Sequence, residues 1–225
     1  MGEAILPLLV VIAGGVAVAI AVLSWFSHRR RQEALRLEAA RLGLEYTSED
    51  PFGLLDLPFE LFERGDGRGI DGIVYGTWQG LSVQVADYWY YEESSKGKTT
   101  SRTTYRFACV VTPIDARCPH LTIAPETFLT RLADAIALDD QQFESEAFNR
   151  AFNVKGDHGF GVAFCDARMM AWLMSGDAGR VYEVHGDRML LAAERIDPPQ
   201  LHAILGETRD WLARVPRVVY SLYPK

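Results

Sequence analysis

The segment that decides the fold is IVYGTWQGLSVQVADYWYY, residues 73–91. The runs Ile73 to Trp78 and Leu81 to Tyr91 are rich in β-branched and aromatic residues, which favour strands. Gln79-Gly80 between them is typical of a tight turn, so the segment predicts an antiparallel hairpin. Because strand side chains alternate between two faces, one face should carry Val83, Val85, Asp87, Trp89 and Tyr91, and the other Ser82, Gln84, Ala86, Tyr88 and Tyr90.

The aromatic end of this segment is the candidate binding surface. Tyr88, Trp89, Tyr90 and Tyr91 form the densest aromatic group in the chain. Aromatic side chains on an extended hairpin can form a face that binds a protein partner. They can equally pack across the sheet against aromatic residues of the next strand, which is the simpler interpretation. Both interpretations stay open at these four positions.

More strands are predicted on both sides of the hairpin. A polar loop is expected from Glu92 to Thr103, followed by strands at Tyr105–Thr112 and Leu121–Ile123. Upstream, Gly67-Arg68-Gly69-Ile70-Asp71-Gly72 matches the G-x-G-x-x-G string of dinucleotide-binding proteins. That motif needs a strand before it and a helix after it, whereas here a strand follows. We interpret the string as a glycine-rich turn and expect no cofactor.

The second half of the chain alternates helices with a hairpin. Helices are predicted from Pro125 to Ile136, around Phe148, after the N-cap Asp166 and from Asp197, with a tight hairpin at Gly186-Asp187. Strands come first and helices mostly later. This order predicts an α+β fold with a largely antiparallel sheet and several packed helices.

The N-terminus predicts a membrane anchor. Ala4 to Phe26 is apolar and uncharged, and as a helix it would reach roughly 34 Å, enough to cross a hydrocarbon core of about 30 Å. Arg29, Arg30 and Arg31 follow it, so the positive-inside rule places the N-terminus outside and the rest in the cytoplasm. A cleaved signal peptide would need a basic start and a shorter apolar core. We therefore expect a single-pass protein of the inner membrane, with anionic lipid headgroups near the three arginines.

Three regions follow from this placement. Residues 1–27 form a short outer tail and the transmembrane helix, residues 28–42 a basic juxtamembrane helix, and residues 43–225 a cytoplasmic α+β domain. The juxtamembrane helix is interpreted as a stalk, with an amphipathic segment lying on the leaflet as the alternative. Small residues recur every fourth position at Ala13, Ala17 and Ala21, so a homodimer through the membrane helix is a further possibility.

Charge and motifs narrow the classes of function. The chain has a net charge of −7, and its first 42 residues carry five arginines against three glutamates, or +2, so the remainder carries −9. An acidic domain disfavours binding of DNA or RNA. Cys118-Pro119-His120 lacks the second ligand pair of a zinc site, so no metal is expected. The three cysteines are uneven in spacing, which favours free thiols in a reducing compartment.

One stretch resembles a known kind of protein. Phe143 to Val154, followed by Asp157, Ala163, Asp166, Met169, Met170 and Leu173, is similar to a signature of uncharacterised bacterial membrane-anchored proteins that form a domain-of-unknown-function family. The resemblance implies a bacterial inner-membrane protein with one or two membrane helices. It supplies no catalytic residues.

The leading hypothesis is therefore a membrane-tethered module that binds or regulates another protein at the inner leaflet. The alternatives are a membrane-associated enzyme with a dispersed site, for which Asp157, His158 and Asp166 are candidates, and an exported domain.

Overall fold

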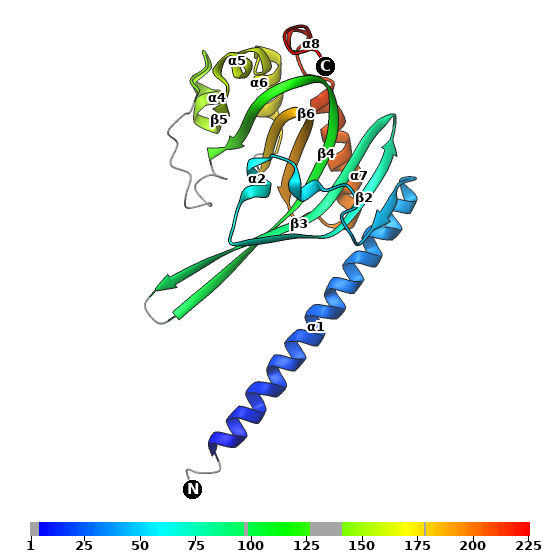
Figure 1. Cartoon of the computed structure of the whole chain (residues 1–225), viewed down its shortest axis with the longest axis vertical. Coiled ribbons are helices and arrows are strands. Elements are labelled where there is room, and N and C mark those ends of the chain that lie inside the picture. Colours follow the sequence, from blue (N-terminus) through cyan, green and yellow to red (C-terminus); the bar gives the residue numbers. More distant parts are fainter. Residues whose placement is uncertain (1–4, 97–98, 127–140, 178) are drawn as a thin grey trace.

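The chain folds around a six-stranded antiparallel sheet, seen in a computed structural model that describes residues 5–96, 99–126, 141–177 and 179–225, without the side chains of residues 5–13, 17, 96 and 99 (Figure 1). The sheet order is β1-β2-β3-β4-β5, and β6 pairs with β4. The predicted α+β class is confirmed. The strands are β1 Glu45–Thr47, β2 Gly67–Trp78, β3 Leu81–Lys96, β4 Thr99–Pro125, β5 Phe152–Gly156 and β6 Arg180–Glu194. The helices are α1 Ile5–Arg41, α2 Glu60–Glu63, α4 Glu146–Ala151, α5 His158–Phe164, α6 Ala167–Ser175, α7 Leu201–Leu212 and α8 Arg217–Leu222.

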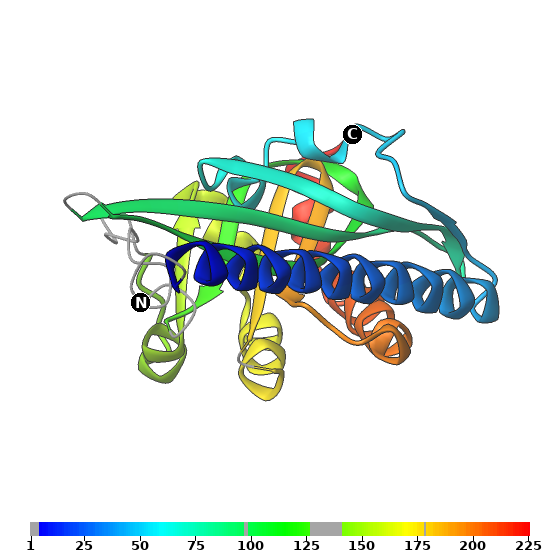
Figure 2. The ribbon, with the colours of Figure 1, turned by 90° about the horizontal axis from the view of Figure 1, so that it is seen from below.

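Each face of the sheet buries its own hydrophobic cluster. Val83 and Val110 belong to the larger cluster, which packs against α4 to α8 and the end of α1. Tyr88 belongs to the smaller cluster on the other face, which Phe62 of α2 helps to close. Seen from below, the sheet lies between α2 on one side and α1, α4, α6 and α7 on the other (Figure 2). Both faces are therefore covered, which explains why apolar side chains on β3 point in both directions.

The β2–β3 hairpin forms as the sequence predicts. Its strands pair from Trp78 opposite Leu81, and the turn residues Gln79 and Gly80 have φ values of 47° and 83°. Two successive residues with positive φ are the mark of a type I′ turn, whose twist matches that of the flanking strands. The turn dipeptide thus sets the register of the ladder from Trp78–Leu81 as far as Ile73–Ala86, beyond which the register shifts.

The polar loop predicted from Glu92 to Thr103 is wrong. The β3–β4 ladder continues through this region, with Glu92 opposite Thr103 and Lys96 opposite Thr99. Arg102 pairs with Glu93 at 2.7 Å and lies over the Tyr91 ring at 3.9 Å. These cross-strand contacts hold a solvent-exposed ladder together, so polarity here reflects exposure of the strands instead of a loop. The separate strand at Leu121–Ile123 is also wrong, since it is the far end of β4.

The tight hairpin predicted at Gly186-Asp187 is wrong as well. β6 runs without reversal from Arg180 to Glu194 and pairs with β4 throughout. Gly186 has a φ of 59° and lies opposite Cys118, where the register shifts. The extra residues of this irregularity lie on β4, where residues 114–117 stand opposite residue 187 alone, so Gly186 continues β6 beside a bulge of β4.

The glycine-rich string is a strand and not a turn. Gly67 pairs with Tyr91 and Gly69 with Trp89 in the β2–β3 ladder. A Cβ atom on Gly67 would lie 2.5 Å from the Tyr91 ring, and one on Gly69 would lie 2.7 Å from the Trp89 ring. The glycines are needed because the aromatic rings of β3 lie across the backbone of β2, as in the aromatic rescue of strand glycines.

Most helix predictions are confirmed where the structure describes them. Ser145 caps α4 and Asp166 caps α6, each by accepting a hydrogen bond from a backbone N–H three residues later. Asp197 begins the turn that leads into α7 through a capping box. The helix predicted from Pro125 to Ile136 lies almost entirely outside the described residues; α5 and α8 were not predicted.

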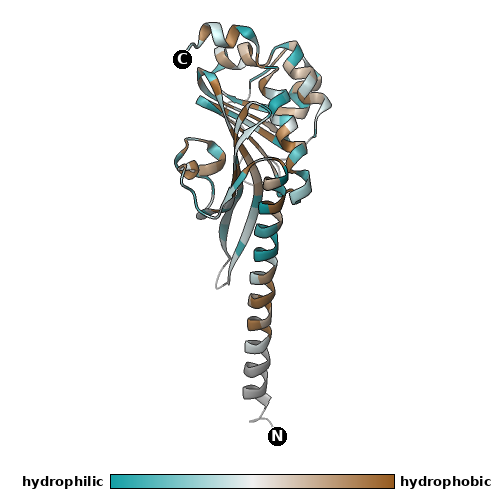
Figure 3. Ribbon diagram, turned by 90° about the vertical axis from the view of Figure 1, so that its right-hand side faces the viewer, coloured by the Kyte–Doolittle hydropathy of each residue, from teal (hydrophilic) through white to brown (hydrophobic). Residues whose placement is uncertain are grey.

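The helix α1 joins the membrane run and the basic segment without a break. Coloured by hydropathy, its apolar turns give way to hydrophilic ones as it reaches the sheet (Figure 3). Leu35 and Ala39 are buried against the domain, so residues 28–41 are docked and do not form a free stalk. No helix in the described part of the chain is long and apolar enough to cross a membrane. Because residues 5–13 and 17 are described without side chains, the span and the dimer contact at Ala13 and Ala17 stay predictions.

We predict that Gly69→Ala destabilises the chain by about 1–3 kcal/mol, the usual effect of overpacking. The new methyl group would displace the Trp89 ring and break the 2.9 Å hydrogen bond from Trp89 Nε1 to Asp71. Gly206→Ala is the matched control, since a Cβ there meets open space within α7 and should stabilise the helix by about 0.5–1 kcal/mol. Urea unfolding followed by tryptophan fluorescence checks both. Equal unfolding midpoints for the two variants would show that the Trp89 ring does not require glycine at position 69.

Candidate functional site

A network of charged side chains lies where α1 meets the sheet. Asp87, on β3, has a side chain only 5% exposed. Arg31 of α1 donates to both its oxygens, from Nε to Oδ2 at 2.6 Å and from Nη2 to Oδ1 at 3.3 Å. Arg195, just after β6, donates from Nη2 to Oδ2 at 3.2 Å. A buried carboxylate is thus held between two guanidinium groups from distant parts of the chain, and this fixes α1 to the sheet.

A second carboxylate, Asp71 on β2, extends this network. It accepts hydrogen bonds from Trp89 Nε1 at 2.9 Å and from Arg106 Nη1 at 2.6 Å. His28 of α1 lies 3.5 Å from the same carboxylate, and Gln32 donates to the Asp71 backbone oxygen at 3.0 Å. The network therefore contains three arginines and one histidine against two aspartates. It carries a positive excess even when the histidine is neutral.

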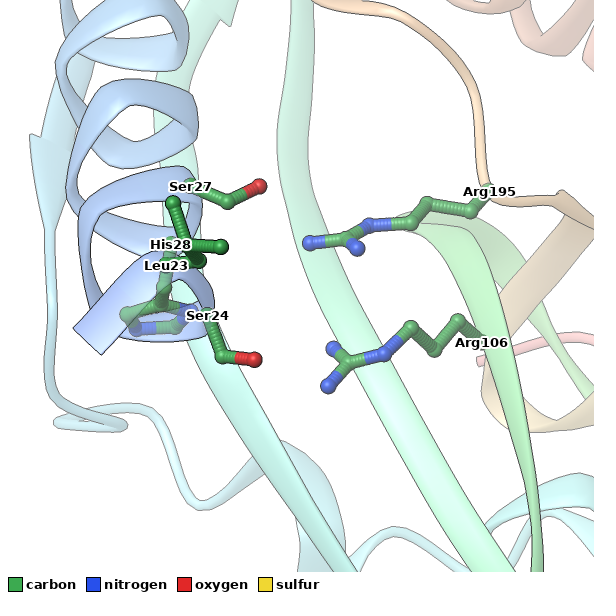
Figure 4. A pocket seen from close by; sticks show the side chains of 6 residues that line it. All are labelled: Leu23, Ser24, Ser27, His28, Arg106 and Arg195. Carbon is green, nitrogen blue, oxygen red and sulfur yellow. The ribbon is translucent and has the colours of Figure 1, made fainter. Parts of the chain in front are cut away.

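A pocket of about 390 Å³ opens beside this network, between α1 and the sheet. Figure 4 shows the side chains of Arg106 and Arg195 reaching across it toward the helix. The lining residues are Leu23, Ser24, Ser27, His28, Arg106 and Arg195. Arg195 Nε is buried and has no hydrogen-bond partner among the described residues. The arrangement presents guanidinium and hydroxyl donors to a space that has no acidic lining residue, so it is suited to an anion.

The structure divides the four predicted partner-face residues between the two sides of the sheet. Tyr88 and Tyr90 are fully buried in the smaller cluster, and burial raises the pKa of both phenols. Tyr88 also donates a hydrogen bond to the Leu61 backbone oxygen at 2.9 Å. Trp89 and Tyr91 stack on each other on the opposite side and are half-buried. Only this second pair has surface available to a partner.

The three arginines predicted to meet lipid headgroups also have separate environments. Arg31 is committed to Asp87. Arg29 lies over the Trp25 ring, 4.9 Å from its centre, and Arg30 is exposed. The prediction of headgroup contacts therefore applies to Arg29 and Arg30.

A second polar cluster secures α2. Glu183 of β6 is fully buried and accepts hydrogen bonds from the backbone N–H groups of Glu60 and Leu61. His120 Nε2 lies 2.8 Å from the same carboxylate, and this hydrogen bond raises the pKa of the imidazole. Cys118, which the sequence pairs with His120, is buried separately, and burial raises the pKa of its thiol to about 11. The structure explains His120 through Glu183, and the described residues contain no group of three metal-ligating side chains.

The residues considered for a dispersed enzyme site have structural roles. Asp157 accepts a hydrogen bond from Phe160 N at 2.7 Å and begins α5. Asp166 does the same for Met169 N at 2.7 Å and begins α6. His158 is exposed at the first residue of α5. The two carboxylates are thus explained as helix caps.

The sequence analysis did not identify the network around Asp87. A usable signal was present, since Asp87 shares its strand face with Val83 and Val85, which are buried. An acidic residue among buried apolar positions needs a partner. Its partners, Arg31 and Arg195, are 56 and 108 residues away, and local patterns do not reveal such pairings.

Comparisons with known proteins bear on the fold. No protein-family model matches the sequence, and no curated protein sequence does either. Among solved structures, the chain is similar to the crystal structure of the mycobacterial trehalose monomycolate transport factor A, TtfA. The TM-score is 0.59 at 14% sequence identity, over 84% of this chain and 97% of that one. A likeness at this identity shows a shared fold alone.

We predict that Asp87→Asn destabilises the chain by about 3–5 kcal/mol, because it leaves Arg31 and Arg195 without a compensating carboxylate. Chemical unfolding of the full chain measures the loss. Glu93→Gln is the matched control, since it removes a carboxylate from the exposed pair with Arg102 and should leave the midpoint nearly unchanged. Similar losses of unfolding free energy for the two variants would show that the buried Asp87 contributes no more to stability than the exposed Glu93.

The His120–Glu183 pair should make stability depend on pH. The folded-state pKa of His120 is raised above 6.5, so the pair's contribution is complete below pH 6.5 and is lost as pH rises through that higher pKa. His120→Gln is expected to reduce this decline in the free energy of unfolding. His158→Gln, at an exposed position, should keep it. The measurement is a series of urea titrations between pH 5 and pH 9, about two units either side of neutrality. Identical pH profiles for wild type and His120→Gln would refute the assignment.

Proposed function

We propose that this chain is a membrane-anchored accessory factor whose domain binds or regulates a partner protein at the inner leaflet. In this proposal, Ala4 to Phe26 crosses the inner membrane, the N-terminus lies outside, and residues 43–225 lie in the cytoplasm. The observation that supports this proposal is that α1 is one continuous helix, which is docked at one end and is apolar and exposed over the described side chains between residues 14 and 26. Its exposed large apolar side chains before the basic segment are Val16, Val18, Ile20, Val22, Leu23, Trp25 and Phe26.

The end of the apolar run has the features of a membrane boundary. Trp25 is exposed and stacks with Arg29 one helical turn later. Tryptophan is enriched at membrane interfaces, and arginine follows it on the cytoplasmic side. These two residues support a boundary close to residue 26.

The docking of α1 supports a regulatory role. Arg31 attaches the helix to β3 and Gln32 attaches it to Asp71 within β2, so the sheet has a fixed direction relative to the anchor. Such a domain would present the same surface to any neighbour in the membrane. The half-buried Trp89 and Tyr91 lie on the same side of β3 as Asp87, and are the aromatic positions available for that contact.

The similar mycobacterial structure is that of a transport factor. We propose from it that the partner of this chain belongs to a membrane transport process. The domain-of-unknown-function resemblance over Phe143–Leu173 supports the same placement at a bacterial inner membrane.

The anchor is tested by extracting membranes with alkaline carbonate. The full chain should stay in the pellet, whereas Val18→Asp combined with Val22→Asp should release it, because each buried charge costs about 2.5–3.5 kcal/mol at the centre of a spanning helix. Leu37→Asp is the matched control: Leu37 is also exposed on α1 but lies beyond the run, so retention is expected.

Reporters fused after Lys225 test the orientation. A fluorescent protein that folds in the cytoplasm should be active there, and alkaline phosphatase should be inactive. The opposite pair of results would reverse the topology, and release of the unmodified chain by carbonate would refute the anchor.

A further inference from the structure

We infer that the pocket between α1 and the sheet binds the phosphate group of an anionic phospholipid from the inner leaflet. This inference rests on the membrane placement proposed above and assigns a ligand to a site that is distinct from the aromatic pair. The pocket is lined by Arg106 and Arg195 on one side and by Ser24, Ser27 and His28 of α1 on the other (Figure 4).

The network beside the pocket has an excess of positive charge. Arg31 and Arg195 share Asp87, while Arg106 and His28 share Asp71. Three guanidinium groups thus face two carboxylates, and one positive charge is left without a counterion in the network. A phosphate diester carries one negative charge and would neutralise it.

Arg106 and Arg195 each have N–H groups beyond the one that binds an aspartate. Arg106 gives one N–H to Asp71 from Nη1, and Arg195 gives one to Asp87 from Nη2. A guanidinium has five donors in a rigid fork, so both side chains can hold an additional oxyanion without leaving their aspartates. The hydroxyls of Ser24 and Ser27 add donors from the helix side.

A second pocket, which is mainly apolar, adjoins the basic one. A space of about 470 Å³ lined by Leu23, Phe26, Ser27 and Arg30 shares Leu23 and Ser27 with the first pocket. One pocket is basic and polar, and the adjoining one is mainly apolar. This combination fits an amphiphile with a charged head and a hydrocarbon chain better than it fits free phosphate.

The position of the pocket along α1 also favours a lipid. Leu23 to His28 mark the end of the apolar run, so in the proposed orientation they lie where headgroups of the inner leaflet begin. The acidic remainder of the chain, at −9, disfavours a nucleic acid phosphate. A phospholipid is therefore the occupant that the charge, the paired pockets and the depth favour together.

The test uses the full chain in an uncharged detergent and counts bound lipid by native mass spectrometry. The probes are dioleoyl phosphatidylglycerol, dioleoyl phosphatidylcholine and inorganic phosphate. Phosphatidylglycerol should bind about tenfold more tightly than phosphatidylcholine, as expected for two basic residues near an anionic headgroup. Inorganic phosphate should not displace it. Equal binding of the two lipids would overturn the inference, and displacement by inorganic phosphate would assign the site to a soluble anion.

Two variants locate the binding. Arg106→Gln should weaken phosphatidylglycerol binding about fivefold, whereas Arg41→Gln removes one exposed charge from α1 outside the pocket and should change it less than about twofold. Ser27→Phe fills the pocket without touching an ion pair and should reproduce the loss, which keeps the test valid if Arg106→Gln unfolds. Equal effects of Arg106→Gln and Arg41→Gln would show general attraction of lipid to a basic surface. Unchanged binding by Ser27→Phe would also overturn the site.

Carbonate extraction of the same proteins separates this inference from the proposed function. A chain that stays in the pellet but does not prefer phosphatidylglycerol refutes only the lipid site. A wild-type chain that leaves the pellet refutes the anchor on which the site depends.

Discussion

The buried carboxylate of Asp87 is the constraint on which the relation between helix and domain depends. A charge that is 5% exposed in the middle of a sheet is unfavourable unless cations reach it. Arg31 and Arg195 approach it from two different elements, so β3 can keep Asp87 only when α1 and the end of β6 are both in place. The ion pairs thus couple the packing of the N-terminal helix to the closing of the sheet. The direction in which α1 leaves the domain follows from this coupling.

That direction gives the molecule one distinctive end. The β3–β4 hairpin and α1 extend from the same side of the domain, as both side views show (Figures 1 and 3). Arg102 and Arg106 lie on β4 of this hairpin, and Trp89 and Tyr91 lie on β3 beside it. Cationic and aromatic side chains therefore occur together on this hairpin, although the domain as a whole is acidic. Net charge alone would have suggested that this domain avoids an anionic surface.

The sequence predicts those parts of the fold whose cause is local. Gln79-Gly80 defines a turn by its own backbone preferences, and Ser145 and Asp166 define helix starts by hydrogen bonds within three residues. The errors arise where the cause is a distant strand. Gly186-Asp187 has the composition of a turn but continues β6, because β4 pairs with the residues on both sides of it. Gly69 has the composition of a turn but belongs to a strand, because Trp89 needs the space above it.

The basic segment shows why the site was harder to predict than the fold. Arg29, Arg30 and Arg31 are adjacent in sequence and count as three charges near a membrane. On a helix, consecutive residues are rotated by about 100°, so they point in three directions. Arg31 points toward the sheet and pairs with Asp87, and Arg29 lies over the Trp25 ring. Arg30 makes neither of these two contacts. Arg106 and Arg195, which are distant in sequence, bring their guanidinium groups to the pocket beside His28 of α1. The fold therefore decides where these charged groups gather, and the sum of charges over a sequence window does not locate them.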